Sequence, residues 1–214
     1  LQTRTGKRNG VATLKIAIDM YKEKLFSKHI MLNKIHYTHI NEMLHPTIKF
    51  DEKNIIDCLT TGLPAGPGSA IGQVVFSSSD AEKYHKNKKK VILIRQETSP
   101  EDVHGMYASQ AIVTSRGGMT SHAALVARGW GKCCVVGCTD IKINFEENYF
   151  IVNNKKIKQN DWITVNGSTG KIYEGTLPLA IPSLKKNELF TNFLSVVKKT
   201  SKLTVRTNAD SPKD

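Results

Sequence analysis

The sequence is short of acidic residues, and this shortage bears first on what the chain can bind. Only 19 Asp and Glu residues accompany 31 Lys and Arg residues, so the formal net charge is +12. A charge of this sign can indicate a nucleic acid as partner. However, the lysines are dispersed in segments such as 86–90 and 153–158, where they mix with asparagine and aromatic residues are rare. This dispersal favours a solvated basic surface without nucleic acid, and a nucleic-acid binding module remains the alternative.

Long apolar runs are also absent. No stretch is long enough to span a membrane, and the first residues do not have the pattern of a secretory signal. We therefore expect a soluble, cytoplasmic, globular protein with no membrane partner. The sequence begins at Leu1 instead of Met, which predicts a segment of a longer chain.

Cysteine is scarce, and the four residues of this type lack the spacing of a metal site. Cys58 is isolated, while Cys133, Cys134 and Cys138 lie in an apolar, β-prone run. A structural metal site needs C-x-x-C spacing with further ligands, and this run does not provide it. We expect buried, reduced thiols and no metal in this part of the chain.

The patterning changes along the chain from helical to mixed. Apolar residues recur at helical spacing over residues 11–44, and a second helical piece is predicted over 34–44, ended by Pro46. Residues 45–58 are expected to form a linker or a short helix. Turn-forming residues at 62–70 then open a region in which strands and helices alternate.

The order of elements in that region indicates an α/β fold. Helices are predicted to begin at Ser79, at Ser99 and at Thr120, and Gly129 is expected to follow the last of them. Strands are predicted at 71–76, 91–94, 111–114, 133–137, 150–152, 162–165 and 171–173, with a connector over 174–203 and a late strand over 203–208.

The most informative stretch is Arg116–Ala124, with the sequence Arg-Gly-Gly-Met-Thr-Ser-His-Ala-Ala. Its two glycines allow a tight turn, and Thr120 or Ser121 can cap a helix that carries His122 on its first turn. The free N–H groups at such a helix start suit a phosphate. Because a neutral imidazole can attack phosphorus, the stretch predicts that His122 carries a phosphoryl group.

This stretch resembles the phosphohistidine motif of the phosphoenolpyruvate-using enzymes. Within that family Met119 favours the pyruvate, phosphate dikinases, because their relatives usually carry Arg at this position. Further runs similar to the dikinases are Gly62–Pro64, Gln96–Asp102, Arg128–Cys134 and Asn166–Gly170. Residues 21–58 and 144–160 are rich in Lys and Asn and diverge most from the family.

The resemblance implies a three-layer β/β/α swivelling phosphohistidine domain over residues 59–176, preceded by a helical connector over 11–58. It implies that residues 177–202 form a linker and that residues 203–214 begin a phosphoenolpyruvate/pyruvate barrel. Residues 1–10 would end an ATP-grasp domain, in which Gln2 and Arg4 face the nucleotide phosphates. These two flanking domains are the expected partners within one polypeptide.

The activity implied by the resemblance joins ATP, phosphate and pyruvate to AMP, diphosphate and phosphoenolpyruvate, with Mg²⁺ bound outside the phosphohistidine domain. His122 would be phosphorylated at its distal (tele) nitrogen and would shuttle between the ATP-grasp and barrel sites. The full enzyme is expected to be a homodimer, and the 214 residues alone are not expected to complete the net reaction.

The resemblance also suggests roles for residues near His122. Thr98 is expected to hydrogen-bond the active histidine, and Gly117 and Gly118 to allow close approach of phosphate. Thr120 is a candidate for regulatory phosphorylation, as in plant-type dikinases, or an ordinary cap like Ser121. Two alternatives stay open for Arg116 and for Arg128: each either screens phosphate charge or is an ordinary surface arginine. A carrier of the enzyme I kind is a further alternative, and Gln2 and Arg4 count against it.

Overall fold

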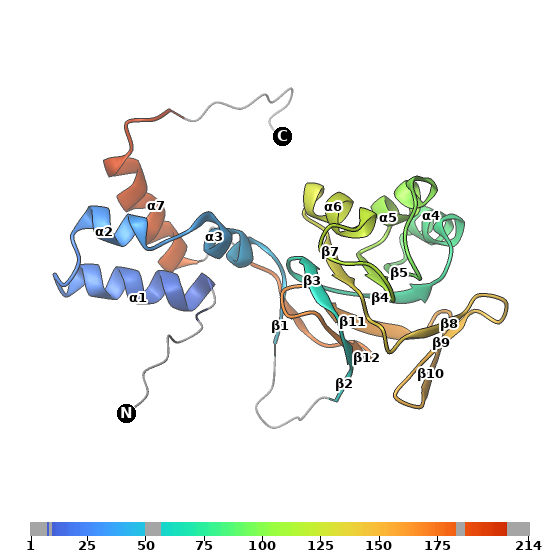
Figure 1. The fold of residues 1–214 in the computed structure, drawn as a ribbon. Coiled ribbons are helices and arrows are strands. Elements are labelled where there is room, and N and C mark those ends of the chain that lie inside the picture. Colours follow the sequence, from blue (N-terminus) through green and yellow to red (C-terminus); the bar gives the residue numbers. More distant parts are fainter. Residues whose placement is uncertain (1–7, 9, 50–56, 183–186, 205–214) are drawn as a thin grey trace. The chain divides into compact units, whose positions relative to one another are not determined.

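The computed structural model describes residues 8, 10–49, 57–182 and 187–204 (Figure 1). Residue contacts divide the chain into two units, one within Leu1–Met43 and Ser183–Asp214, the other within Leu44–Pro182. Gln2 and Arg4 lie outside the described residues. In the part of the chain that is described, no helix is long and apolar enough to cross a membrane.

The first unit is helical, and its two chain segments share one core. Its helices are α1 (Gly10–Lys22), α2 (Lys28–Asn33), α3 (Tyr37–Leu44) and α7 (Glu188–Thr200). Helix α1 contacts both α2 and α7. The buried residues are Leu14, Ala17, Ile18, Met31, Met43, Phe190 and Phe193. Because the apolar residues of α7 recur three and four positions apart, one side of this helix packs into the core.

The prediction of a helical piece over 34–44 is wrong for its first residues. Helix α2, which was not predicted separately, ends with Lys34 as its C-cap, and α3 begins only at Tyr37. Between them, His39 Nδ1 accepts a hydrogen bond from the backbone N–H of His36 at 3.1 Å. This side chain satisfies an amide that would otherwise need a helical carbonyl, so a new helix starts here.

The second unit is built on an eight-stranded sheet of order β2-β12-β11-β4-β5-β6-β7-β3. The neighbours β4 to β7 run parallel, and the remaining pairs are antiparallel. The strands are β2 (Cys58–Thr61), β3 (Leu63–Gly66), β4 (Ser69–Val75), β5 (Val91–Arg95), β6 (Ala111–Thr114), β7 (Cys133–Val136), β11 (Trp162–Asn166) and β12 (Lys171–Glu174).

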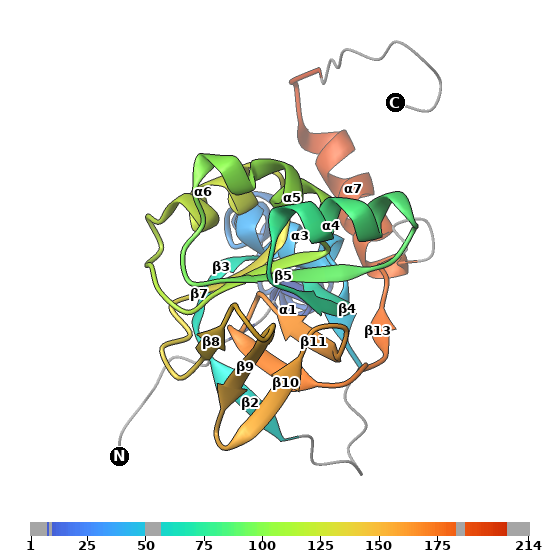
Figure 2. The ribbon, with the colours of Figure 1, turned by 90° about the vertical axis from the view of Figure 1, so that its right-hand side faces the viewer.

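Helices connect the parallel strands, as the backbone geometry of a parallel pair requires. These are α4 (Ser78–Lys86), α5 (Val103–Ala108) after the short 3₁₀ helix η1 (Pro100–Asp102), and α6 (His122–Gly129). Figure 2 shows α4, α5 and α6 together on one face of the sheet. The opposite face is covered by a smaller antiparallel sheet of β8 (Lys142–Asn144), β9 (Tyr149–Val152) and β10 (Lys155–Lys158).

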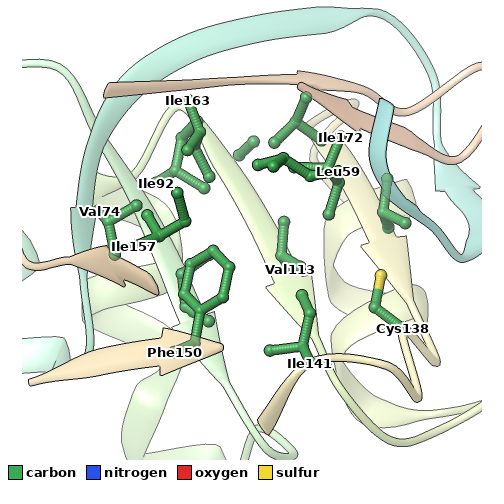
Figure 3. Packing of buried hydrophobic residues seen from close by; sticks show 14 of the residues in the cluster. Leu59, Val74, Ile92, Val113, Cys138, Ile141, Phe150, Ile157, Ile163 and Ile172 are labelled. Atoms are coloured by element: carbon green, nitrogen blue, oxygen red, sulfur yellow. The ribbon is translucent and has the colours of Figure 1, made fainter. Parts of the chain in front are cut away.

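Two hydrophobic clusters hold these layers together. Along β5, Val91 and Leu93 pack under the helices, while Ile92 and Ile94 pack toward the smaller sheet. Successive side chains of a strand point to opposite faces, so a continuously apolar strand fills both layers. Figure 3 shows the second cluster, in which Phe150 from the smaller sheet lies among residues of the main sheet. The expected α/β fold with three β/β/α layers is therefore confirmed.

Several elements of this unit differ from the sequence-based expectation. Strands β2, β3, β8 and β10 were not predicted. Strand β3 contains the turn-forming residues Pro64 and Gly66, and β8 and β10 each have a single apolar residue. The two-residue strands β1 (Thr47–Ile48) and β13 (Leu179–Ala180) pair antiparallel where the chain enters and leaves the unit. Leu203 and Thr204 form no strand, and the rest of the predicted strand 203–208 lies outside the described residues.

Candidate active site

His122 is the first residue of α6, at the end of the loop that follows buried strand β6. Ser121 is the N-cap, with extended backbone angles, and its Oγ accepts a hydrogen bond from Ala124 N at 3.5 Å. Of the two residues predicted to cap the helix, Ser121 therefore does so, and Thr120 is exposed in the loop. The imidazole of His122 is half-buried at the first turn.

The other end of α6 corrects a prediction. Gly129 was expected to follow the helix, but it is the last helical residue, and Trp130 is the C-cap. The glycine with a left-handed backbone is Gly131, whose φ is +63°. Gly131 is the residue after the C-cap because two hydrogen bonds close the helix there: Lys132 N donates to Ala127 O at 2.8 Å, and Gly131 N donates to Arg128 O at 3.2 Å.

The two glycines before the histidine have different structural roles. Gly117 has φ of +95°, and a Cβ there would lie 2.9 Å from Ser121 Cβ and 3.2 Å from Ser121 Oγ. Gly118 has no such backbone conformation, and a Cβ there would meet nothing within 4 Å. Gly117 is thus required by the turn and by the adjacent cap, whereas Gly118 leaves open space at the surface of the loop.

Thr98 reaches His122 from the loop after β5. Its Oγ1 lies 3.0 Å from His122 Nδ1. The two loops are held together by backbone hydrogen bonds from Ser115 N to Arg95 O (3.1 Å) and from Arg116 N to Gln96 O (2.9 Å). These bonds extend the parallel pairing of β5 and β6 past the ends of the strands. The sheet register therefore brings Thr98 and His122 together across a sequence separation of 24 residues.

A buried carboxylate, that of Asp102, holds the loop that carries Thr98, and this role was not predicted from the sequence. Asp102 is 4% exposed, accepts from Ser99 N at 3.0 Å, and lies 3.3 Å from Arg95 Nε. Arg95 also donates to Phe76 O at 3.1 Å. The spacing of Ser99 and Asp102 gave a signal, since a carboxylate three residues after a cap commonly bonds back to it. The ion pair with Arg95 gave no such local signal.

On the other side of the loop, Arg128 holds the backbone before the helix. Its Nη2 donates to Met119 O at 2.5 Å. This guanidinium ties the last turn of α6 to the glycine loop, so Arg128 acts through the position of the loop. Arg116 is exposed and contacts the side chain of Gln96.

The three buried cysteines are poor nucleophiles, because burial raises the pKa of each thiol. All four are free thiols, and burial raises the pKa of Cys133 and of Cys138 to about 12. Burial also raises the pKa of Cys134, whose Sγ lies 3.9 Å from Ala123 O at the start of α6. Among the described residues, no group of three His, Cys, Asp or Glu side chains is placed to hold a metal ion.

The geometry defines the chemistry open to His122. When Nδ1 carries the proton and donates it to Thr98 Oγ1, the lone pair of Nε2 is available. Nε2 is also the distal nitrogen, at which phosphorylation is expected from the family resemblance. A family model described as "PEP-utilising enzyme, mobile domain" matches residues 87–170, which include both side chains.

Curated relatives resemble the chain beyond residues 87–170. "Pyruvate, phosphate dikinase 2" of Oryza sativa subsp. japonica is 47% identical over all 214 residues, which are 24% of its length. "Pyruvate, phosphate dikinase, chloroplastic" of Flaveria pringlei is also 47% identical over the whole chain, which is 22% of its length. The chain therefore spans about a quarter of these curated relatives.

One solved structure gives a weaker likeness to part of the chain. The solution structure of Enzyme I (nEIt) covers 50% of this chain and 37% of its own, at 20% identity and a TM-score of 0.29. This score is too low to carry an argument about the site.

Proposed function

We propose that this chain is the phosphoryl-carrying part of a pyruvate, phosphate dikinase and that His122 is the carrier. The observation that carries the proposal is the 3.0 Å contact between Thr98 Oγ1 and His122 Nδ1. A proton held on Nδ1 keeps the lone pair on Nε2, the nitrogen that must be unprotonated to attack phosphorus. Similarity to dikinases over the whole chain, which spans about a quarter of their length, supports this choice of reaction.

In the half-reaction with phosphoenolpyruvate, Nε2 forms a bond to phosphorus while the P–O bond to the enol oxygen breaks. The electron pair stays on that oxygen, and the enolate takes up a proton to give pyruvate. Throughout, Thr98 keeps accepting from Nδ1–H, so the ring does not rotate between the free and phosphorylated states. In the other half-reaction, ATP and phosphate yield AMP, diphosphate and the same phosphohistidine.

The loop contributes positioning more than covalent chemistry, as is usual for phosphoryl transfer. Gly117 and Ser121 set the start of α6, and the free N–H groups of that first turn face a transferred phosphate. Gly118 leaves room for its approach. Mg²⁺ is expected for the full reaction, but the described residues offer no group of ligands for it.

Thr120 is proposed as a regulatory site in this scheme. It is exposed and lies two residues before the carrier. A phosphate on its hydroxyl adds a charge of about −1.5 to −2 next to the imidazole, which repels an incoming phosphoryl group. Modification of Thr120 would thus block His122 without any change in fold.

The proposal extends to the segments around the mobile domain. Residues 1–10 and 203–214 are proposed to join an ATP-grasp domain, with Gln2 and Arg4 at the nucleotide, and a phosphoenolpyruvate/pyruvate barrel. Residues 11–58 and 177–202 are proposed as the connectors around the 59–176 domain, in a homodimeric enzyme. Free cysteines support a reducing compartment such as the cytoplasm.

The test uses a complete dikinase that contains this chain and phosphoenolpyruvate with a radioactive phosphoryl group. We expect one label per chain that is lost in acid and retained in base, as for a phosphohistidine. The variant His122→Ala is expected to take up no label and to complete no turnover. As matched control, His85→Ala changes an exposed histidine at the end of α4 and is expected to label normally. Labelling of the His122→Ala enzyme would overturn the proposal.

A further inference from the structure

A polar groove lies beside the active loop and is not explained by the carrier chemistry. It consists of two adjoining pockets that share Gln96, Arg116 and Phe145. We call it the Arg116 groove. Its other charged lining residues are Arg95, Glu97 and Lys142.

The groove has an excess of uncompensated positive charge. Arg95 is paired with Asp102 at 3.3 Å. In the described part of the chain, neither Arg116 nor Lys142 has a carboxylate within ion-pair distance. Glu97 is the one acid of the lining. An exposed, unpaired guanidinium in a concave site is suited to phosphate, which it can bind through two parallel hydrogen bonds.

Arg116 is held in place before any ligand arrives. Its backbone N–H donates to Gln96 O at 2.9 Å, and its carbonyl accepts from Thr114 Oγ1 at 2.6 Å. With the Gln96 amide oriented so that its oxygen faces the guanidinium, Oε1 accepts from Nε, Nη1 and Nη2 of Arg116 at 3.2–3.3 Å. A neutral amide fixes the side chain and leaves its charge available, so little conformational freedom remains to be lost on binding.

The groove is next to the carrier but does not contain it. The Arg116–Gln96 pair is formed by the same two loops that form the His122–Thr98 pair, so both lie at one edge of the sheet. Neither His122 nor Thr98 lines the groove. A phosphate bound to Arg116 is therefore a neighbour of the phosphorus that reacts with His122, and is not that phosphorus itself.

We propose that the Arg116 groove binds phosphate groups of the nucleotide that do not end on His122. This inference rests on the proposed carrier function and deepens it. Phosphoenolpyruvate has one phosphate, which is the group transferred, whereas ATP brings phosphates that remain after transfer. Arg116 consequently serves the nucleotide half-reaction and leaves the phosphoenolpyruvate half-reaction unaffected.

The experiment measures the two half-reactions separately in the complete enzyme. One arm labels the histidine from phosphoenolpyruvate, and the other labels it from ATP carrying radioactive β-phosphorus, with inorganic phosphate present. For Arg116→Gln we expect the ATP arm to slow about 10- to 100-fold with a higher KM for ATP, as for loss of a charge-assisted hydrogen bond. The phosphoenolpyruvate arm is expected to stay within about twofold, which also shows that the variant is folded.

Two further variants separate the charge of Arg116 from the shape of its guanidinium and provide a control. Arg116→Lys keeps the charge without the planar fork and is expected to lose less of the ATP arm than Arg116→Gln. Lys171→Gln removes an exposed charge on β12 and is expected to leave both arms unchanged. His122→Ala loses both arms under the proposed function, so failure of that function is recognised independently.

Three results would overturn the assignment of Arg116. Equal loss in both arms would mean that it shields the phosphohistidine itself. No loss in either arm would make it a surface residue. A loss of kcat for the ATP arm at unchanged KM would assign it to docking against acidic side chains of the nucleotide domain.

Discussion

Replacement of Gly117 by alanine tests the geometry of the active loop most directly. At φ of +95° an alanine is strained, which costs about 1–2 kcal/mol in the left-handed region. Its Cβ would also lie 2.9 Å from Ser121 Cβ, closer than real side chains approach. The N-cap must then shift, and loss of such a cap costs about 0.5–2 kcal/mol. Together these effects predict a loss of roughly 2–4 kcal/mol in the free energy of unfolding.

Gly118→Ala is the matched control, because it adds the same methyl group one residue later. A Cβ at Gly118 meets nothing within 4 Å, and the backbone there is not left-handed. We expect a change of less than about 1 kcal/mol, toward greater stability, since alanine restricts the unfolded chain.

Tryptophan fluorescence during urea unfolding measures both variants. The two tryptophans, Trp130 and Trp162, lie in the Leu44–Pro182 unit, and Trp130 directly follows α6. The signal therefore reports the unit that contains the loop. If Gly117→Ala and Gly118→Ala lowered the free energy of unfolding equally, or if neither lowered it, the different roles assigned to the two glycines would be refuted.

The remaining predictions concern the surroundings of the loop. Thr98→Val is expected to slow labelling from phosphoenolpyruvate about tenfold and to alter its pH profile, whereas Thr98→Ser restores both; identical behaviour of the two variants would contradict the hydrogen-bond role. Asp102→Ala is expected to lower the free energy of unfolding by about 2–3 kcal/mol in urea, because Arg95 and a backbone N–H lose their buried acceptor, and Asp102→Asn is expected to lose less. The pKa values of Cys133 and Cys138 are raised from 9.0 to about 12 by burial. Between pH 9 and pH 12 the thiol ionises in the unfolded chain and stays protonated in the folded chain. Each of the two thiols should therefore lower the free energy of unfolding by about 1.4 kcal/mol per pH unit as the pH rises through this range. Rapid alkylation of the folded protein at pH 8 by iodoacetamide would contradict their burial.

Local sequence was sufficient for the features that depend on neighbouring residues. The helix start at Ser121 and His122, the strands 91–94 and 111–114, and the alternation of strands and helices were all predicted within one or two residues. Periodicity and capping act over a few positions, so the sequence displays them directly. Strands β8 and β10 escaped prediction, because each has a single apolar residue, Ile143 or Ile157, and one residue shows no alternation.

Long-range pairing could not be read from the sequence in the same way. The expected partnership of Thr98 with His122 came from resemblance, and it is the register of β5 against β6 that gives the 3.0 Å contact its geometry. The pairing of Arg95 with Asp102 and of Arg116 with Gln96 had no pattern to reveal it. The sequence by itself determined that a histidine begins a capped helix after a glycine turn, because these are local backbone requirements. Only the tertiary structure decided which ring nitrogen is held and which cation is left unpaired, because both depend on loops that the sheet brings together.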